Sequence, residues 1–233
     1  MAPWALRAWP LALLLGFTSA EDGSCDFTFE CAEHVVVPAG IKEIPKFAFR
    51  DCAQLQTIEL PDGLVYIGAS AFSGATALSQ IALPASLEHI GTFAFSRSAL
   101  TSITLPGKLS SVGEYAFNEC TRLTTASCEH AQLTATPPGI FYGCRSLTHV
   151  TLPSTLERVS VATFYGCSAL ATLNFPDTLE EIGEHAFHDC TSLEFVDLPA
   201  SLRSLGHSAF QGCTALAPYT VRAGVRVGVT DDD

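Results

Sequence analysis

Residues 170–190 read Leu-Ala-Thr-Leu-Asn-Phe-Pro-Asp-Thr-Leu-Glu-Glu-Ile-Gly-Glu-His-Ala-Phe-His-Asp-Cys. The first part alternates apolar and polar residues up to a proline, which is typical of a short strand with one buried side. The Leu-x-x-Ile-Gly block that follows predicts a second short extended piece. The closing Ala-Phe-x-x-Cys has the spacing of a single helical turn that places Phe and Cys on one side.

The same pattern recurs through most of the chain. Its anchoring phenylalanines lie 22 to 24 residues apart, at Phe49, Phe72, Phe95, Phe117, Phe141, Phe164, Phe187 and Phe210. One unit cannot bury its own apolar side, whereas stacked units share a continuous core. We therefore predict a solenoid of about eight repeats, mainly short stacked parallel strands with helical turns.

This pattern resembles the BspA-like leucine-rich repeat family, whose unit is Leu-x-x-Ile-x-Leu-Pro-x-x-Leu-x-x-Ile-Gly-x-x-Ala-Phe-x-x-Cys. The resemblance covers about residues 32–217 and implies a leucine-rich repeat solenoid. It also implies a secreted or surface protein that binds proteins or cell surfaces, because such proteins are typical of the family.

The fourth repeat departs from the family pattern. In its strand block the residues at the expected Leu, Ile, Leu and Pro positions are Leu123, Ala126, Cys128 and Glu129, and the stretch 137–139, Pro-Pro-Gly, replaces the usual Ile-Gly. We expect a bulge or loop there that bends the stack.

The chain divides into four segments. Residues 1–20 combine one charge, a short apolar run and small residues, which predicts a cleaved secretory signal too short to span a membrane. Residues 21–35 are expected to form an N-terminal cap and 36–217 the repeat array. Residues 218–233 are interpreted as a degenerate C-terminal cap with an acidic tail, or as the stub of a longer chain.

Composition narrows the function classes. The chain is 48% apolar and 15% charged, with a formal net charge of −12, which excludes a disordered polyelectrolyte and argues against nucleic-acid binding. It has no glycine-rich phosphate loop and no recognisable nucleophile arrangement. His185 and His188 fall at variable, solvent-facing positions rather than in a metal site. We therefore predict no cofactor, no metal and no enzymatic activity; the oligomeric state is left open.

Six of the nine cysteines share the last position of the repeat: Cys52, Cys120, Cys144, Cys167, Cys190 and Cys213. Ala75 and Ser98 fill that position in the other two repeats, which favours a ladder of free thiols packed in the core. A disulfide framework is the alternative, because secretion would allow one. A one-column ladder does not supply the converging ligands that zinc needs.

Cys25 and Cys31 stand apart from the ladder, in the expected N-terminal cap. They pair with each other only if the segment folds back, because six extended residues would separate them by roughly 20 Å. Whether one or both form a cap disulfide is left open.

Two variable columns hold candidate binding residues. The position after the anchor includes Tyr142, Tyr165 and His188 in successive repeats, so these rings should form a stripe; two positions before the anchor stand Phe47, Phe93 and Tyr115. Exposed aromatic residues beside polar ones are typical of partner-binding surfaces. The alternative is that the rings merely pack over neighbouring repeats.

The favoured interpretation is a secreted or cell-surface, non-enzymatic module that recognises a protein ligand or a cell-surface or matrix component through these columns. A carbohydrate-binding or extracellular-matrix structural protein is the second hypothesis. A structural spacer, or a truncated receptor ectodomain, is the third.

Overall fold

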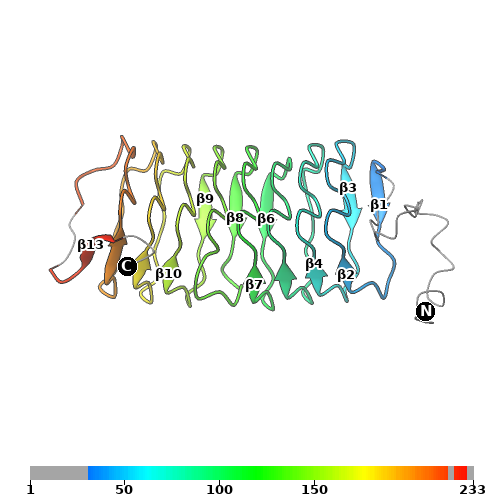
Figure 1. Ribbon diagram of the computed structural model, residues 1–233, viewed down its shortest axis with the longest axis horizontal. Helices are drawn as coiled ribbons and strands as arrows, with labels where there is room; N and C mark the ends of the chain where they lie inside the picture. Colours follow the sequence, from blue (N-terminus) through cyan, green and yellow to red (C-terminus); the bar gives the residue numbers. More distant parts are fainter. Residues whose placement is uncertain (1–30, 220–222, 230–233) are drawn as a thin grey trace.

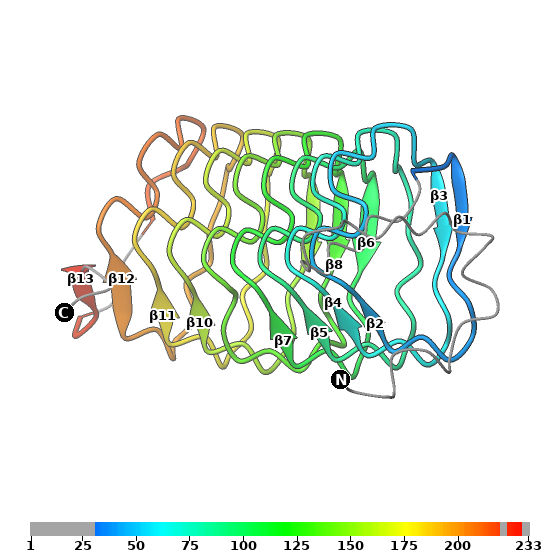
Figure 2. The ribbon, with the colours of Figure 1, turned by 45° about the vertical axis from the view of Figure 1, so that its right-hand side comes forward.

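The computed structural model describes residues 31–219 and 223–229. In these residues each repeat forms one turn of a solenoid, and successive turns stack along its long axis (Figure 1). Figure 2 shows two rows of short strands running along this axis. The expected signal at 1–20 and Cys25 lie outside the described residues.

Each row of strands comes from one block of the repeat. The Leu-x-x-Ile-x-Leu block forms β1 (His34–Val36), β3 (Thr57–Glu59), β6 (Ser102–Thr104), β8 (Thr125–Ser127) and β9 (His149–Thr151). The Leu-x-x-Ile-Gly block forms β2 (Glu43–Ile44), β4 (Tyr66–Ile67), β5 (His89–Ile90), β7 (Ser111–Val112), β10 (Arg158–Val159), β11 (Glu181–Ile182) and β12 (Ser204–Gly206). The last strand, β13 (Arg226–Val229), lies beyond the array.

Within each sheet, neighbouring strands come from adjacent turns and pair in parallel. The sheets have the orders β1-β3, β6-β8-β9, β2-β4-β5-β7 and β10-β11-β12-β13. In β2 and β4, for example, Ile44 lies opposite Ile67, which is its counterpart one repeat later. The stacked parallel strands of a leucine-rich repeat solenoid are therefore present as predicted.

The anchoring phenylalanines form a continuous spine through the core. Neighbouring rings from Phe49 to Phe210 lie 5.2 to 5.8 Å apart, with interplanar angles of 2 to 19°. The six anchors from Phe72 to Phe187 are no more than 1% exposed. Since burying one Phe contributes about 1.5–3 kcal/mol, this column is a major source of stability.

The Ala-Phe-x-x-Cys segment is a run of tight turns, and the described residues contain no helix. Hydrogen bonds join residues three apart, as from Ser98 N to Phe95 O at 3.1 Å. In each repeat the residues two before and two after the anchor have positive φ, as at Phe93 (54°) and Arg97 (58°). These left-handed residues end any helix within one turn, which explains why the expected helical turns do not extend.

A glycine column allows the turns to approach closely. A Cβ added to Gly91 would lie 2.4 Å from Ala69 N and 2.7 Å from Gly68 C in the preceding turn. The glycine N–H also donates to that turn, from Gly91 N to Ile67 O at 2.7 Å. The close contact is with backbone, so glycine is needed here for space rather than for an unusual φ.

The irregularity predicted in the fourth repeat is confined to its second half. β8 pairs in regular register with both β6 and β9, so the weaker Ala126 and Cys128 matches do not disturb the strand. The interruption falls after β7, where the sheet β2-β4-β5-β7 ends before the sheet that begins at β10. Pro137 occupies the glycine column at this point and has no N–H to donate to the preceding turn.

Candidate functional site: an aromatic stripe on the turn edge

The candidate binding residues lie on the tight turns beside the buried anchors. The Ala and Phe of each turn are buried, whereas the candidate rings before and after the anchors are exposed or partly exposed. Backbone bonds between turns hold these positions, as from Phe93 N to Glu114 O at 3.0 Å and from Tyr115 N to Pro138 O at 3.0 Å. The repeat thus sets the spacing of any rings placed there.

The structure brings Tyr142, Tyr165 and His188 together as a stack. The Tyr142 and Tyr165 rings are 4.7 Å apart at 8°, and the Tyr165 and His188 rings are 4.7 Å apart at 1°. All three side chains are only partly exposed. Their edges and polar atoms therefore form the accessible part of this row.

The second column joins the first. Phe93 and Tyr115 stack at 5.2 Å, and the Tyr115 ring then lies 6.1 Å from Tyr142 at a 60° tilt. Gly139 makes this contact possible, because a Cβ there would lie 2.2 Å from Tyr115 Cε1. We define the aromatic stripe as the five rings of Phe93, Tyr115, Tyr142, Tyr165 and His188.

Phe47 does not belong to the aromatic stripe. Ser70 occupies its column in the turn between Phe47 and Phe93 and carries no ring. Phe47 instead has cationic neighbours, with Arg50 Cζ 5.4 Å and Lys46 Nζ 5.8 Å from the centre of its ring. It is a separate cation–π cluster.

Two histidines missed by the ring-column analysis extend the stripe at its C-terminal end. His185 lies 5.3 Å from the His188 ring, and His207 lies 6.2 Å from His185. His185 and His188 each have an acidic neighbour, since His185 Nε2 lies 3.3 Å from Glu184 and His188 Nδ1 lies 3.2 Å from Asp189. The repeat register could have revealed His185 and His207, because they are near neighbours in successive turns.

The centre of the stripe lies between carboxylates. Glu119 and Asp189 each stand two residues after an anchoring phenylalanine, at the position with positive φ. Gly143 and Gly166 occupy this position in the turns of the two stacked tyrosines. Partial burial, the neighbouring tyrosines and these two carboxylates all raise the pKa of Tyr142. Tyr142 therefore stays protonated at neutral pH and keeps a phenol O–H that can donate a hydrogen bond.

The ladder cysteines have a packing and hydrogen-bonding role. Each free ladder thiol donates to the carbonyl of the anchoring Phe one turn earlier, at 3.1 to 3.2 Å; the donors are Cys120, Cys144, Cys167, Cys190 and Cys213. Burial raises the pKa of Cys120 to about 11 and that of Cys128 to about 12. Buried, protonated thiols of this kind are chemically inert.

Cys52 corrects the predicted ladder. It forms a disulfide with Cys31, with a Cα–Cα distance of 5.5 Å, so it is not a free thiol. Cys31 reaches it because residues 31–33 lie against the first turn, as the hydrogen bond from Gln56 N to Glu33 O at 2.8 Å shows; residue spacing alone did not reveal this contact. Cys213, at the other end, is the ladder thiol that is only partly buried.

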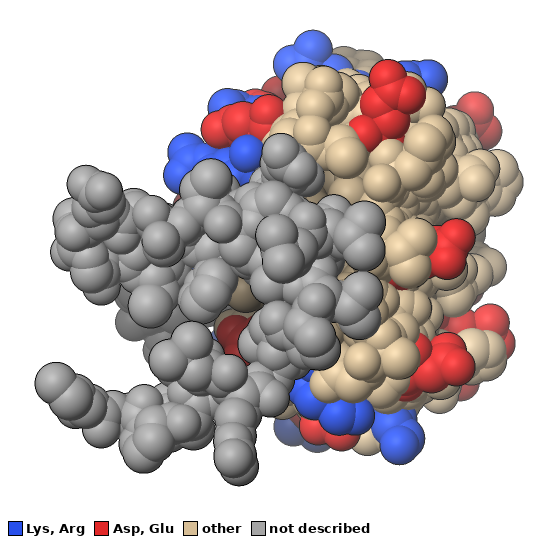
Figure 3. Space-filling model, turned by 90° about the vertical axis from the view of Figure 1, so that its right-hand side faces the viewer, with Lys and Arg blue, Asp and Glu red and all other residues tan. Residues whose placement is uncertain are grey.

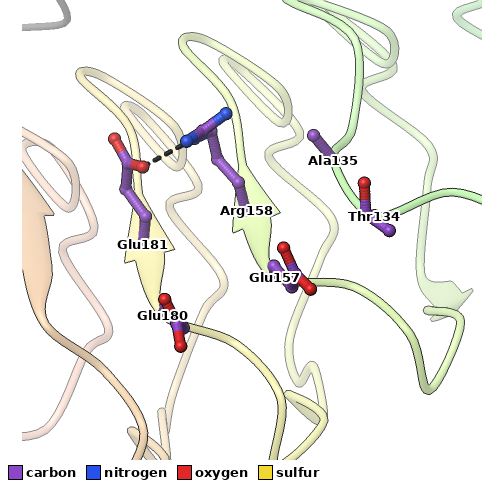
Figure 4. A pocket seen from close by; sticks show the side chains of 6 residues that line it. All are labelled: Thr134, Ala135, Glu157, Arg158, Glu180 and Glu181. Carbon is purple, nitrogen blue, oxygen red and sulfur yellow. Dashed lines mark hydrogen bonds and ion pairs between the residues drawn. The ribbon is translucent and has the colours of Figure 1, made fainter.

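The described residues contain no group of three or more His, Cys, Asp or Glu side chains that could hold a metal ion. A small acidic pocket of about 80 Å³ lies at β10 and β11, with Glu157 and Glu180 on its wall (Figure 4). Its charges are largely paired, since Arg158 Nε lies 2.6 Å from Glu181 and Arg203 lies 3.1 Å from Glu180. The pocket therefore offers no clear ligand chemistry.

Figure 3 views the solenoid from its N-terminal side. On the part of the surface that is coloured by charge, both acidic and basic side chains occur, with uncharged side chains between them. None of the described residues forms a helix long and apolar enough to cross a membrane.

The parallel turns, buried phenylalanine spine and outward-facing columns together define a leucine-rich repeat solenoid. Comparison with known families agrees, with a match to the BspA type leucine-rich repeat region in six copies, over residues 24–136 and 134–227. The chain belongs to this family. No curated protein matches it.

Three similar solved structures come from bacteria. A leucine-rich repeat protein from Bacteroides ovatus is 32% identical with a TM-score of 0.78, over 84% of this chain and 51% of that one. The leucine-rich repeat protein of T. pallidum is 27% identical with a TM-score of 0.58, over 82% of this chain and 81% of that one. A Eubacterium ventriosum protein, 22% identical with a TM-score of 0.60, shares the fold over 84% of this chain and 47% of its own. This chain thus spans about half the length of the Bacteroides protein.

Proposed function

We propose that this protein is a secreted, non-enzymatic binding module that recognises a protein partner through the aromatic stripe. The observation that carries the proposal is the row of neighbouring rings from Phe93 to His188 on the turn edge, in which three of the four ring pairs are stacked and the Tyr115–Tyr142 pair is tilted. Tyrosine provides large contact area and a hydrogen-bonding group at low conformational cost, and it is enriched at binding hot spots. Membership of a repeat family built for extended recognition surfaces also supports it.

The backbone of the stripe supports a role beyond packing. Phe93 and Tyr115 have φ of 54° and 55°, a region that disfavours bulky side chains. Serine, glycine and alanine fill the same column at Ser70, Gly139 and Ala162, so the fold does not require rings there. Bulky rings at left-handed positions are therefore costly, and partner binding gives a physical reason for having them.

Secretion is supported by the N-terminal pattern and by the Cys31–Cys52 disulfide. Disulfides persist in oxidising compartments outside the cytosol. N-terminal sequencing of protein recovered from the medium should begin at Glu21. Recovery of an intact residue 1 from the medium would contradict the cleaved signal.

The binding proposal is tested by cross-linking pull-down from the surface and medium of the producing organism. The full secreted protein is compared with the variant Tyr142→Ser, Tyr165→Ser, His188→Ser. The control is Tyr66→Ser with His89→Ser, because these two residues form a ring pair at 6.1 Å on the strand face. Thermal unfolding verifies that both variants keep the fold.

A discrete partner captured by the unmodified protein and the control, but not by the stripe variant, is the expected result. Equal capture by all three forms would remove the stripe from the interaction. Failure to capture any partner would instead favour a structural array.

A carbohydrate ligand is the second candidate, and the hydroxyl groups on the strand face favour it. Thr151 Oγ1 donates to Ser127 Oγ at 3.2 Å, and Ser102 and Thr125 occupy an adjoining exposed column. Loss of capture after enzymatic removal of glycans from the partner fraction would support this candidate over protein recognition.

A further inference from the structure

A groove of about 480 Å³ opens where the strand row is interrupted after β7. Its walls come from β7 and the following Gly113 and Glu114 on one side and from Leu133 and residues 135–138 on the other. The groove is shallow and largely open to solvent. The walls are mixed, with serine and threonine hydroxyls beside Val112 and Leu133.

The groove exists because one turn leaves the ladder. In the regular turns the glycine N–H donates to the preceding turn, as from Gly113 N to Ile90 O at 2.7 Å. Pro137 stands at the equivalent position and has no N–H. The last backbone hydrogen bond before the gap runs from Gln132 N to Leu109 O at 2.9 Å. The next bond between these two turns runs from Tyr115 N to Pro138 O at 3.0 Å.

The departing segment is held firmly against the following turn. Thr134 O accepts from Glu157 N at 2.7 Å and from Arg158 N at 3.0 Å. The buried Thr136 hydroxyl accepts from Ser160 N at 2.9 Å and shares a hydrogen bond with Thr163 at 2.8 Å. Because these bonds fix residues 134–136 away from β7, the groove is built into the fold.

The edge of β7 is consequently left unpaired. Among the described residues, no backbone hydrogen bond uses the Val112 N–H, the Val112 carbonyl or the Ser110 carbonyl. In the regular turns the equivalent groups bond to the next turn, as Ile67 O does to Gly91 N. A donor flanked by acceptors along a strand edge is what an extended peptide pairs with.

The surroundings of the groove define the kind of peptide. Small side chains, Ser111 and Ala135, occupy the outward column that holds His89 and Arg158 in neighbouring turns, so the edge is accessible. Glu114 is the charged residue on the groove wall; it is exposed and forms no ion pair among the described residues. Glu114 directly precedes Tyr115, so the groove adjoins the aromatic stripe.

We infer that the groove binds an extended segment of the protein partner, whose main chain pairs with the edge of β7. A lysine or arginine side chain of that segment lies against Glu114, and the chain continues toward the ring of Tyr115. The overall charge of −12 also favours a cationic segment. The inference rests on the proposed function, because the segment belongs to the partner that the stripe recognises.

The test uses the full secreted protein and displayed linear peptides of eight residues. Peptides are selected on the unmodified protein, and their affinity is then measured for Ser111→Trp, which fills the groove. The matched control is His89→Trp, one turn earlier and outside the groove. Glu114→Gln tests the charge, and the triple stripe variant separates the groove from the stripe.

Selected peptides should contain lysine or arginine and bind Ser111→Trp at least about tenfold more weakly, with no change for His89→Trp. Methylating those peptide amides that donate to β7 should abolish binding, whereas methylating the alternate amides should not, because only alternate groups of a strand face one neighbour. Exchange of the Val112 amide hydrogen should slow when peptide is bound. Glu114→Gln should weaken the cationic peptides.

Three results would overturn the inference: no peptide is enriched, Ser111→Trp binds as well as the unmodified protein, or methylation has no positional effect. If the triple stripe variant still binds the peptides and also captures the partner as well as the unmodified protein does, the stripe is rejected and the groove is kept. Partner capture that depends on the stripe but not on Ser111→Trp would reject the groove alone.

Discussion

Replacing Gly91 with alanine should strongly destabilise the protein, although it adds one methyl group. The new Cβ would lie 2.4 Å from Ala69 N, 2.7 Å from Gly68 C and 2.8 Å from Ala69 Cα. All three are backbone atoms, so no flexible side chain can move aside. Relief requires the two turns to separate, which lengthens the 2.7 Å bond from Gly91 N to Ile67 O.

The magnitude follows from two contributions. Overpacking a well-packed core costs about 1–3 kcal/mol, and a weakened backbone hydrogen bond costs about 1 kcal/mol. Gly91→Ala should therefore lower the free energy of unfolding by about 3 kcal/mol. Urea denaturation followed by circular dichroism measures this as a lower transition midpoint with little change in slope.

Gly107→Ala is the matched control. A Cβ at Gly107 would lie 3.5 Å from its nearest neighbour, His130 O, which is ordinary contact. This variant should change the free energy of unfolding by less than about 0.5 kcal/mol. The reasoning is refuted if Gly91→Ala is as stable as the unmodified protein, or if both variants lose the same stability.

Three further predictions concern the core and the cysteines. Phe95→Ala, in the interior of the spine, should cost about 3–5 kcal/mol in urea denaturation, because both neighbouring rings lose a stacked partner. Replacing Cys31 and Cys52 together with serine should cost about 3 kcal/mol, since their disulfide closes a loop of 21 residues; the same loss should appear when the unmodified protein is measured with reductant. Cys213 should be the first ladder thiol alkylated by iodoacetamide in the native protein, because it is partly exposed and the neighbouring Cys190 thiol lowers its pKa. Labelling of Cys213 should therefore begin at a lower pH than for an ordinary thiol, whereas Cys120, with a pKa of about 11, should react only after unfolding; mass spectrometry across a pH series would contradict this if Cys120 reacted first.

Much of the architecture follows from periodicity. The spacing of Phe49 to Phe210 predicts the number of turns, and the alternation at Ile-x-Leu predicts which residues are buried. The strand ends follow because proline cannot donate to a ladder. The turns were less predictable, since the left-handed φ of residues such as Phe93 and Ala162 has no residue-type signature.

The sequence alone predicts only part of the candidate site. Reading down columns identifies Tyr142, Tyr165 and His188 as neighbours, because a fixed repeat places equivalent residues one turn apart. It treats Phe93 and Tyr115 as a separate column, since the crossing between columns depends on the absence of a side chain at Gly139. Phe47 does not join the stripe, because Ser70, which lies between Phe47 and Phe93 in the column, carries no ring.

By itself the sequence determined the repeat, the buried spine and the glycine and proline positions, because these are local patterns copied from turn to turn. The tertiary structure decided what happens where the copies differ. The Cys31–Cys52 pairing, the joining of two ring columns over Gly139 and the groove beside β7 all depend on contacts between non-equivalent residues of adjacent turns. Periodicity describes equivalent positions only, so these contacts emerge once the turns are stacked in space.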